Sequence, residues 1–152
     1  MVEIWLTEPY YQEYQKRKET LFSEAEKVKL FTLTQELQHN WPRCATDPQT
    51  LPEVGTGSKL YYVKCGFTQP RATFRVAFGF RPRAGSDGLL IALTCRTKEE
   101  LAQGSKGGTQ AWYDHMATVG RSRWTDYQRG HIRFWKIYRS DGSSEKSVDG
   151  RT

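Results

Sequence analysis

The sequence predicts an α+β domain in which an N-terminal strand and two helices pack on an antiparallel β-meander, followed by an additional C-terminal helix. Residues 9–39 carry two stretches with helix-capping signals, whereas residues 60–98 carry three β-prone runs separated by glycine and proline. The 152 residues have the length of one domain. This order of elements is typical of helices packed on one face of a sheet.

The first strand and helix are predicted from the first twenty residues. Residues 2–6 alternate apolar side chains with Glu3 and Trp5, which indicates a short strand at or near a sheet edge. Thr7 can cap a helix that begins near Pro9, a residue suited to an early helical position. We therefore expect a helix from Pro9 to Glu19.

A capping box marks the second helix. The Ser23 hydroxyl can accept a hydrogen bond from the backbone while the Glu26 carboxylate reaches back to the cap. The helix that follows has a broad apolar face and is expected to stop before Asn40-Trp41-Pro42. Residues 40–59 contain three prolines and no sustained period, so they are predicted to form a connecting loop.

The meander comprises residues 60–65, 72–80 and 89–98. In the second run, apolar side chains at the even positions indicate one core face, so Arg75 is expected to point away from the core and to be exposed. The third run is almost continuously apolar from Leu89 to Leu93, as expected for a central strand covered on both faces.

The C-terminal third predicts one further helix. Residues 103–108 are rich in glycine and are expected to be flexible, and Thr109 can cap a helix after them. Trp112, Met116 and Val119 form a stripe on this helix that could lie against the sheet or against the first two helices. Gly120 could bend or end the helix.

The domain is expected to span residues 1–139, with a helical extension from about residue 102. Residues 131–138 could form a late strand or an extended arm. Residues 140–152 are polar with one valine, which predicts a disordered tail.

The charge of the chain is unevenly distributed. Residues 1–60 hold 7 Lys and Arg against 9 Asp and Glu, a net charge of −2, whereas residues 61–152 hold 16 against 8, a net charge of +8. The sheet-forming half is therefore the cationic half, which raises the expectation of a polyanionic partner.

Several other classes of protein are not indicated. No apolar run approaches the roughly 18 residues of a membrane span, and Met1 to Leu6 leads directly into charged residues, so a cytoplasmic protein without membrane contact is expected. The three cysteines lack metal-binding or redox spacing and are expected to be reduced, and the three histidines are scattered. Neither a metal nor another cofactor is predicted.

The three strands of the meander carry a family resemblance. A strand with Leu60-Tyr61-Tyr62-Val63-Lys64, a strand with Phe74-Arg75-Val76-Ala77-Phe78, and an aliphatic strand from Leu89 to Lys98 that ends in Cys-Arg-x-Lys follow a strand and two helices. This pattern resembles the RelE/HigB branch of the RelE/ParE superfamily, toxins of type II toxin-antitoxin modules. The resemblance covers residues 2 to about 101.

The resemblance implies a ribosome-dependent endoribonuclease that cuts mRNA and is neutralised by a cognate antitoxin, with which it could form an oligomer. It implies that Lys64 binds or activates the substrate and that Arg75 and Arg96 stabilise the phosphate. RNA cleavage by 2′-hydroxyl attack needs a base, an acid and cations near the phosphate. Further contacts to RNA are expected from three arginines near the second strand: Arg71, Arg81 and Arg83.

The base is left open by this pattern. Tyr62 stands where active members often have a second cation, and the tyrosine or histidine that the family carries near the end of the meander has no aligned counterpart. Lys98, Tyr113 or His115 could replace it. Tyr113 and His115 are two residues apart on a predicted helix, so they point to different sides and are not both expected in one site.

Two functions remain open from the sequence. The first is the mRNA-cleaving toxin. The second is a non-catalytic protein of the RelE/ParE type that binds and inhibits a host protein such as gyrase, which the missing second cation and the extra C-terminal residues favour.

Overall fold

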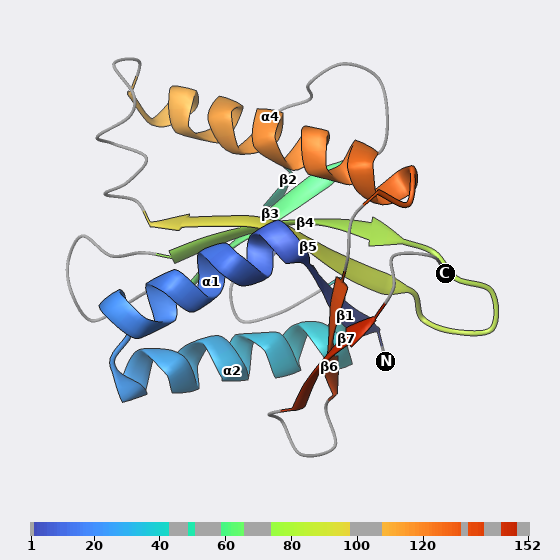
Figure 1. Cartoon of the computed structure of the whole chain (residues 1–152), viewed down its shortest axis with the longest axis horizontal. Helices are drawn as coiled ribbons and strands as arrows, with labels where there is room; N and C mark the ends of the chain where they lie inside the picture. The colour runs from blue at the N-terminus through green and yellow to red at the C-terminus, as the bar shows by residue number, and fades with distance from the viewer. Residues whose placement is uncertain are drawn as a thin grey trace.

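The structure, a computed structural model, describes residues 2–42, 49–50, 59–65, 74–97, 108–131, 134–138 and 144–148 (Figure 1). Seven strands form one mixed sheet in the order β2-β3-β4-β5-β1-β6-β7. The elements in chain order are β1 (Glu3–Thr7), α1 (Glu8–Leu21), α2 (Glu24–Asn40), β2 (Gln49–Thr50), β3 (Leu60–Cys65), β4 (Phe74–Arg81), β5 (Leu89–Thr97), α4 (Gly108–Gln128), β6 (Phe134–Tyr138) and β7 (Ser144–Val148).

The α+β class and the meander are confirmed, but the sheet is not purely antiparallel. β3 pairs with β4 and β4 with β5, both antiparallel, whereas β1 runs parallel to β5. The prediction that residues 2–6 lie at or near a sheet edge was wrong, because β1 also pairs with β6 on its other side. Two strands from the C-terminal part of the chain, β6 and β7, lie between β1 and that edge of the sheet.

Both predicted helix starts are confirmed. The Thr7 side chain accepts a hydrogen bond from the Tyr10 backbone N–H, 3.4 Å away, and Pro9 lies in the first turn of α1. Ser23 and Glu26 form the complete capping box at the start of α2. The buried Glu26 carboxylate is therefore used by the backbone of its own helix.

The helices cover both faces of the sheet, not one. α1 and α2 lie on one side and α4 on the other (Figure 1). The first face packs Phe74, Val76 and Phe78 with α1 and α2, whereas the second packs Ala77 with α4. The expected stripe on α4 is confirmed at Met116, which is buried against the sheet; the Trp112 side chain lies outside the described residues.

Small residues on β4 make room for α4. An added Cβ at Gly79 would collide with the ring of Trp124 of α4, so the helix approaches the strand closely here. α4 runs without a break from Gly108 to Gln128, so Gly120 does not end it. Because α4 occupies this face, the side chains expected to point to solvent are covered, and Arg75 is only 5% exposed.

The C-terminal part of the chain extends the sheet. Residues 134–138 form β6, so the alternative of a late strand is the one observed. The expectation of a disordered tail needs correction for Ser144–Val148, which pair as β7 with β6. Backbone hydrogen bonding to a neighbouring strand can order a segment with few apolar side chains, which a composition argument overlooks. Likewise Gln49–Thr50, expected to be loop, pair with β3 as β2.

Within the described ranges, none of the helices combines the length and apolar character needed to cross a bilayer.

Candidate active site

Three cations stand in one row across the sheet. Lys64 of β3 is paired directly with Arg75 of β4, and Arg75 is paired directly with Arg96 of β5. Residues paired in this way lie on the same face, with Cβ atoms about 4.5–5.5 Å apart. The sequence-predicted set is therefore brought together by strand register, on the face that α4 covers.

Tyr113 of α4 lies against this row. Its ring is 6.0 Å from the Arg75 guanidinium carbon, and the ring centroids of Tyr62 and Tyr113 are 4.8 Å apart. The Tyr113 phenol oxygen accepts hydrogen bonds from the Tyr62 hydroxyl and from Arg75. Tyr62 stands at the position where a second cation was expected. It is buried and orients Tyr113 through this hydrogen bond.

The two phenols have opposite pKa shifts. Burial raises the pKa of Tyr113, but the hydrogen bonds from Tyr62 and Arg75 and the charges of Arg75 and Lys64 outweigh it, so the net pKa is lowered. Burial, the hydrogen bond to Tyr113 and the charge of Tyr113 raise the pKa of Tyr62 to about 12. Tyr113 is therefore the phenol prepared to lose a proton, and Tyr62 is its hydrogen-bond donor.

This arrangement can transfer a proton beside a phosphate. Lys64 and Tyr113 are both partly exposed, so a ligand can reach them, whereas Arg75 lies beneath them. A phenol with a lowered pKa can act as a general base or acid, and an ammonium group beside it can stabilise negative charge that develops on phosphate.

We expect ultraviolet titration to resolve these phenols. One of the eight tyrosines should ionise before the others, and Tyr113→Phe should remove this first step, because the cations near Tyr113 stabilise its phenolate. The absorbance of tyrosinate, followed between pH 7 and 12, measures the effect. A first step that persists in Tyr113→Phe would contradict the assignment.

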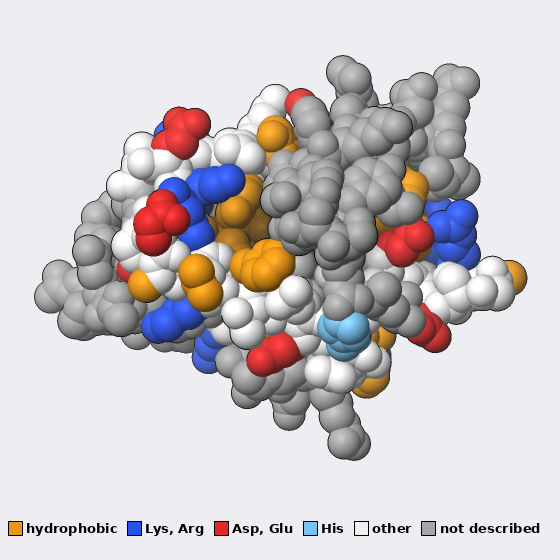
Figure 2. Space-filling model, turned by 90° about the horizontal axis from the view of Figure 1, so that it is seen from below, with side chains coloured by type: hydrophobic (Ala, Val, Ile, Leu, Met, Phe, Trp, Pro, Cys, Tyr) orange, Lys and Arg blue, Asp and Glu red, His pale blue; other side chains and the backbone are white. Residues whose placement is uncertain are grey.

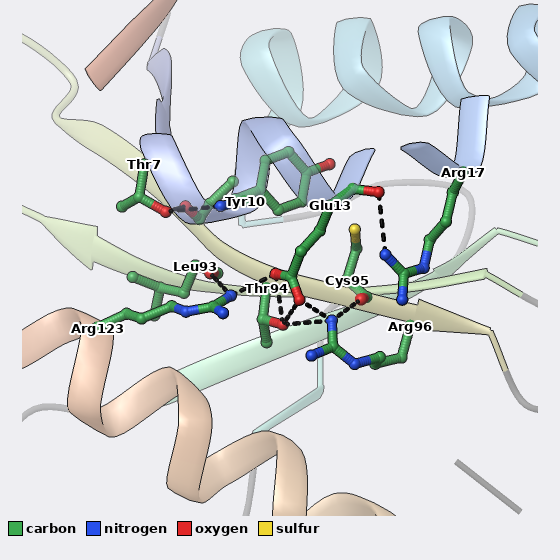
Figure 3. A network of polar contacts seen from close by, with 10 residues as sticks. Thr7, Tyr10, Glu13, Arg17, Leu93, Thr94, Cys95, Arg96 and Arg123 are labelled. Atoms are coloured by element: carbon green, nitrogen blue, oxygen red, sulfur yellow. Dashed lines mark hydrogen bonds and ion pairs between the residues drawn. The ribbon is translucent and has the colours of Figure 1, made fainter. Parts of the chain in front are cut away.

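A carboxylate links this row to two helices. Glu13 of α1 forms ion pairs with Arg96 of β5 and with Arg123 of α4 (Figure 3). The Thr94 hydroxyl donates to the same carboxylate at 3.1 Å, and Arg123 donates to the Leu93 carbonyl at 2.9 Å. The side chains of Glu13, Arg96 and Arg123 are 15%, 21% and 20% exposed. The network therefore joins α1, the sheet and α4 at the end of the cation row.

Arg96 is held by several acceptors. Besides Glu13, its Nη1 donates to the Cys95 carbonyl at 2.6 Å and to the Thr94 hydroxyl oxygen at 3.2 Å. The expectation that Arg75 and Arg96 are exposed was wrong for the buried Arg75, and Arg96 is only partly accessible. α4 covers Arg75, and Glu13 pairs with Arg96. Neither contact can be predicted from the local sequence pattern of the strands.

The remaining predicted residues are distributed elsewhere. His115 is exposed on α4, about 200° around the helix from Tyr113. Arg81 lies six residues from Arg75, at roughly 20 Å along the same strand, and donates to the Tyr127 hydroxyl at 2.9 Å. Arg83 forms a 3.7 Å ion pair with Glu3. Lys98 and Arg71 lie outside the described residues.

Three participants were not predicted from the sequence. Tyr62 was recognised only as a departure from the family pattern, and neither Glu13 nor Arg123 belongs to any motif. Glu13 lies on a helix among other charged residues and Arg123 on a helix of mixed polarity, so their sequence context carries no signal. Glu13 and Arg123 form an ion pair because α1 and α4 come together at the end of the cation row.

Within the described part of the chain, no group of three His, Cys, Asp or Glu side chains could hold an ion.

Comparisons with models of protein families, with curated proteins and with solved structures gave no match to this chain.

Proposed function

We propose that this protein is an endoribonuclease that cuts mRNA on the ribosome, as the toxin of a toxin-antitoxin module. One observation carries the proposal: strand register places Lys64, Arg75 and Arg96 in one row, and the Arg75 guanidinium carbon lies 6.0 Å from the ring centroid of Tyr113. The lowered pKa of Tyr113 beside these cations supports it. The net charge of +8 on residues 61–152 supports a polyanionic substrate. The ribosome and the antitoxin are included in the proposal because the meander resembles that of the RelE/HigB toxins.

The proposed reaction is an internal transesterification. The ribose 2′-oxygen attacks the adjacent phosphorus, the bond from phosphorus to the 5′-oxygen breaks, and the products are a 2′,3′-cyclic phosphate and a 5′-hydroxyl. The phenolate of Tyr113 takes the proton of the 2′-hydroxyl, solvent water gives a proton to the leaving 5′-oxygen, and Lys64 stabilises the phosphate charge that develops during attack.

The two arginines are assigned positioning roles. Arg75 is buried and holds the Tyr113 oxygen, while Arg96 is held by Glu13. Substituting Arg75 or Arg96 with alanine would therefore disturb packing as well as chemistry, which makes both poor tests of catalysis. Lys64 and Tyr113, both partly exposed, are the better targets.

Primer extension on a defined mRNA in a purified translation system tests the proposal. We expect wild-type protein to produce cuts that require ribosomes, and Lys64→Gln to lower the cutting rate about 100-fold, as loss of one electrostatic contact to the transition state does. Lys59→Gln is the matched control, because Lys59 is an exposed lysine immediately before β3. Absence of cuts by folded wild-type protein would reject the proposal.

A second candidate function is non-catalytic binding of a host protein such as gyrase. The burial of Arg75 and the pairing of Arg96 and Arg123 with Glu13 favour it, because these charges are already compensated within the protein. Folded wild-type protein that makes no cuts but binds purified gyrase would support this candidate.

The partners belong to the same proposal. A cognate antitoxin would neutralise the protein by covering or reshaping the face that carries Lys64 and Tyr113, and the complex could be oligomeric. Because ribosomes that carry mRNA are cytoplasmic, the proposal includes a cytoplasmic location for the protein.

A further inference from the structure

A cavity lies on the face of the sheet opposite the candidate active site. It has a volume of about 300 Å³, lies between α1, α2 and the first sheet face, and is partly open to solvent. From below, the surface is hollowed where hydrophobic side chains gather, with lysine or arginine side chains beside the opening (Figure 2). This volume is at the lower end of the range of about 300–1,000 Å³ found for small-molecule sites.

The interior of the cavity is mostly apolar, although Thr34 and Gln38 also line it. Its floor consists of strand residues such as Val63, Val76 and Leu90, and α2 contributes Leu30 and Leu33 to its wall. These five side chains are at most 9% exposed. An aliphatic chain could replace water along these apolar side chains.

Two lysines give the lining its charge. Lys18 of α1 and Lys27 of α2 both line the cavity, and the described lining residues include neither aspartate nor glutamate. Lys18 lies over the Tyr14 ring, with its ammonium nitrogen 5.7 Å from the centroid. Lys27 forms a 2.9 Å ion pair with Glu24, but Glu24 is 89% exposed. An exposed pair of this kind is weak, so Lys27 can accept another carboxylate at little cost.

We propose that this cavity binds a fatty acid of medium chain length. The acyl chain occupies the space between α1, α2 and the sheet, and the carboxylate lies between the Lys18 and Lys27 ammonium groups. The combination of an apolar interior with two cations and no acid among the described lining residues selects a single-chain anion over a neutral or cationic amphiphile. The site is separate from the row of Lys64, Arg75 and Arg96, which lies across the sheet.

Calorimetric titration of the full chain with monomeric decanoate tests the ligand class. We expect saturable binding of one decanoate per chain, about tenfold tighter than octanoate, because two more methylenes are buried. Decyltrimethylammonium, which has the same chain and the opposite charge, should bind at least tenfold more weakly. Equal affinity for both charges, or no saturable binding of decanoate, would overturn the proposal.

A pair of double variants tests the two lysines. Lys18→Gln/Lys27→Gln should weaken decanoate binding about fivefold and leave decanol binding unchanged, because only the carboxylate uses the ammonium groups. The control Lys16→Gln/Lys29→Gln removes two exposed lysines from the same helices and should bind decanoate as wild type does. Equal weakening in both variants would show general charge attraction and contradict the site.

Anionic phosphatidylglycerol vesicles separate a free fatty acid from a membrane surface. We expect no co-sedimentation of the protein with vesicles, because the cavity holds one chain and the two lysines lie on separate helices. Co-sedimentation without saturable decanoate binding would replace the fatty acid by a membrane and overturn the proposal.

Discussion

Tyr113→Phe is expected to lower the rate of RNA cleavage by about 10²–10⁴-fold, the usual contribution of a general acid or base. The substitution removes the phenol oxygen that accepts hydrogen bonds from Tyr62 and Arg75 but keeps the ring that packs on both. Single-turnover primer extension on ribosome-bound mRNA measures the rate.

The pH dependence gives this test a second readout. The phenolate form of Tyr113 accepts the 2′-hydroxyl proton, so the wild-type rate should rise with pH up to the lowered pKa of Tyr113. The phenylalanine variant should lack this rise. A flat wild-type profile over this range would show that Tyr113 is not the base.

Tyr127→Phe on the same helix is the matched control. Tyr127 is buried and accepts a hydrogen bond from Arg81, roughly 20 Å from Arg75 along β4. The Tyr127→Phe variant should retain the wild-type cleavage rate, since Tyr127 lies outside the cation row. Comparable losses in both variants would indicate a structural effect of removing a hydroxyl from α4.

Glu13→Ala is expected to lower the free energy of unfolding by about 3 kcal/mol. Glu13 is the shared partner of Arg96 and Arg123, and its loss leaves two guanidinium groups, each about four-fifths buried, without their carboxylate. Removal of one member of a largely buried ion pair costs roughly 3–5 kcal/mol, and partial exposure places this case at the lower end. Urea denaturation at neutral pH measures the change.

Glu24→Ala provides the comparison for this prediction. Glu24 is also a helical glutamate in an ion pair, but its side chain is 89% exposed. Its replacement should cost less than about 1 kcal/mol, because solvent screens the pair and only the helix dipole adds to it. If the two variants lost equal stability, the Glu13 network would not be a buried one in solution.

The parts of the fold that depend on local chemistry were predictable. The caps at Thr7 and Ser23 need only a side chain and the backbone within three residues, so their sequence pattern is sufficient. The meander also involves neighbouring segments, and its register places Lys64, Arg75 and Arg96 in a row as the order of the strands suggested.

The parts that depend on distant segments were not predictable. The period of β4 correctly divided its side chains into two faces, but it could not show that α4 would cover the second. The small residues Ala77 and Gly79 were the available sign that a helix covers this face, because a face exposed to solvent does not require small side chains. Tyr113 could only be offered beside Lys98 and His115, since the choice among them depends on where α4 lies.

The position of β1 in the sheet has a consequence for the order of folding. Its partners are residues 89–92 and residues 134–136, which follow it by some 80 to 130 positions in the chain. β1 is synthesised early but cannot pair until these later segments have been synthesised. Contacts this distant in sequence slow the folding of a domain. During synthesis both backbone edges of this apolar strand lack their native partners, and unpaired strand edges make a nascent chain prone to aggregation.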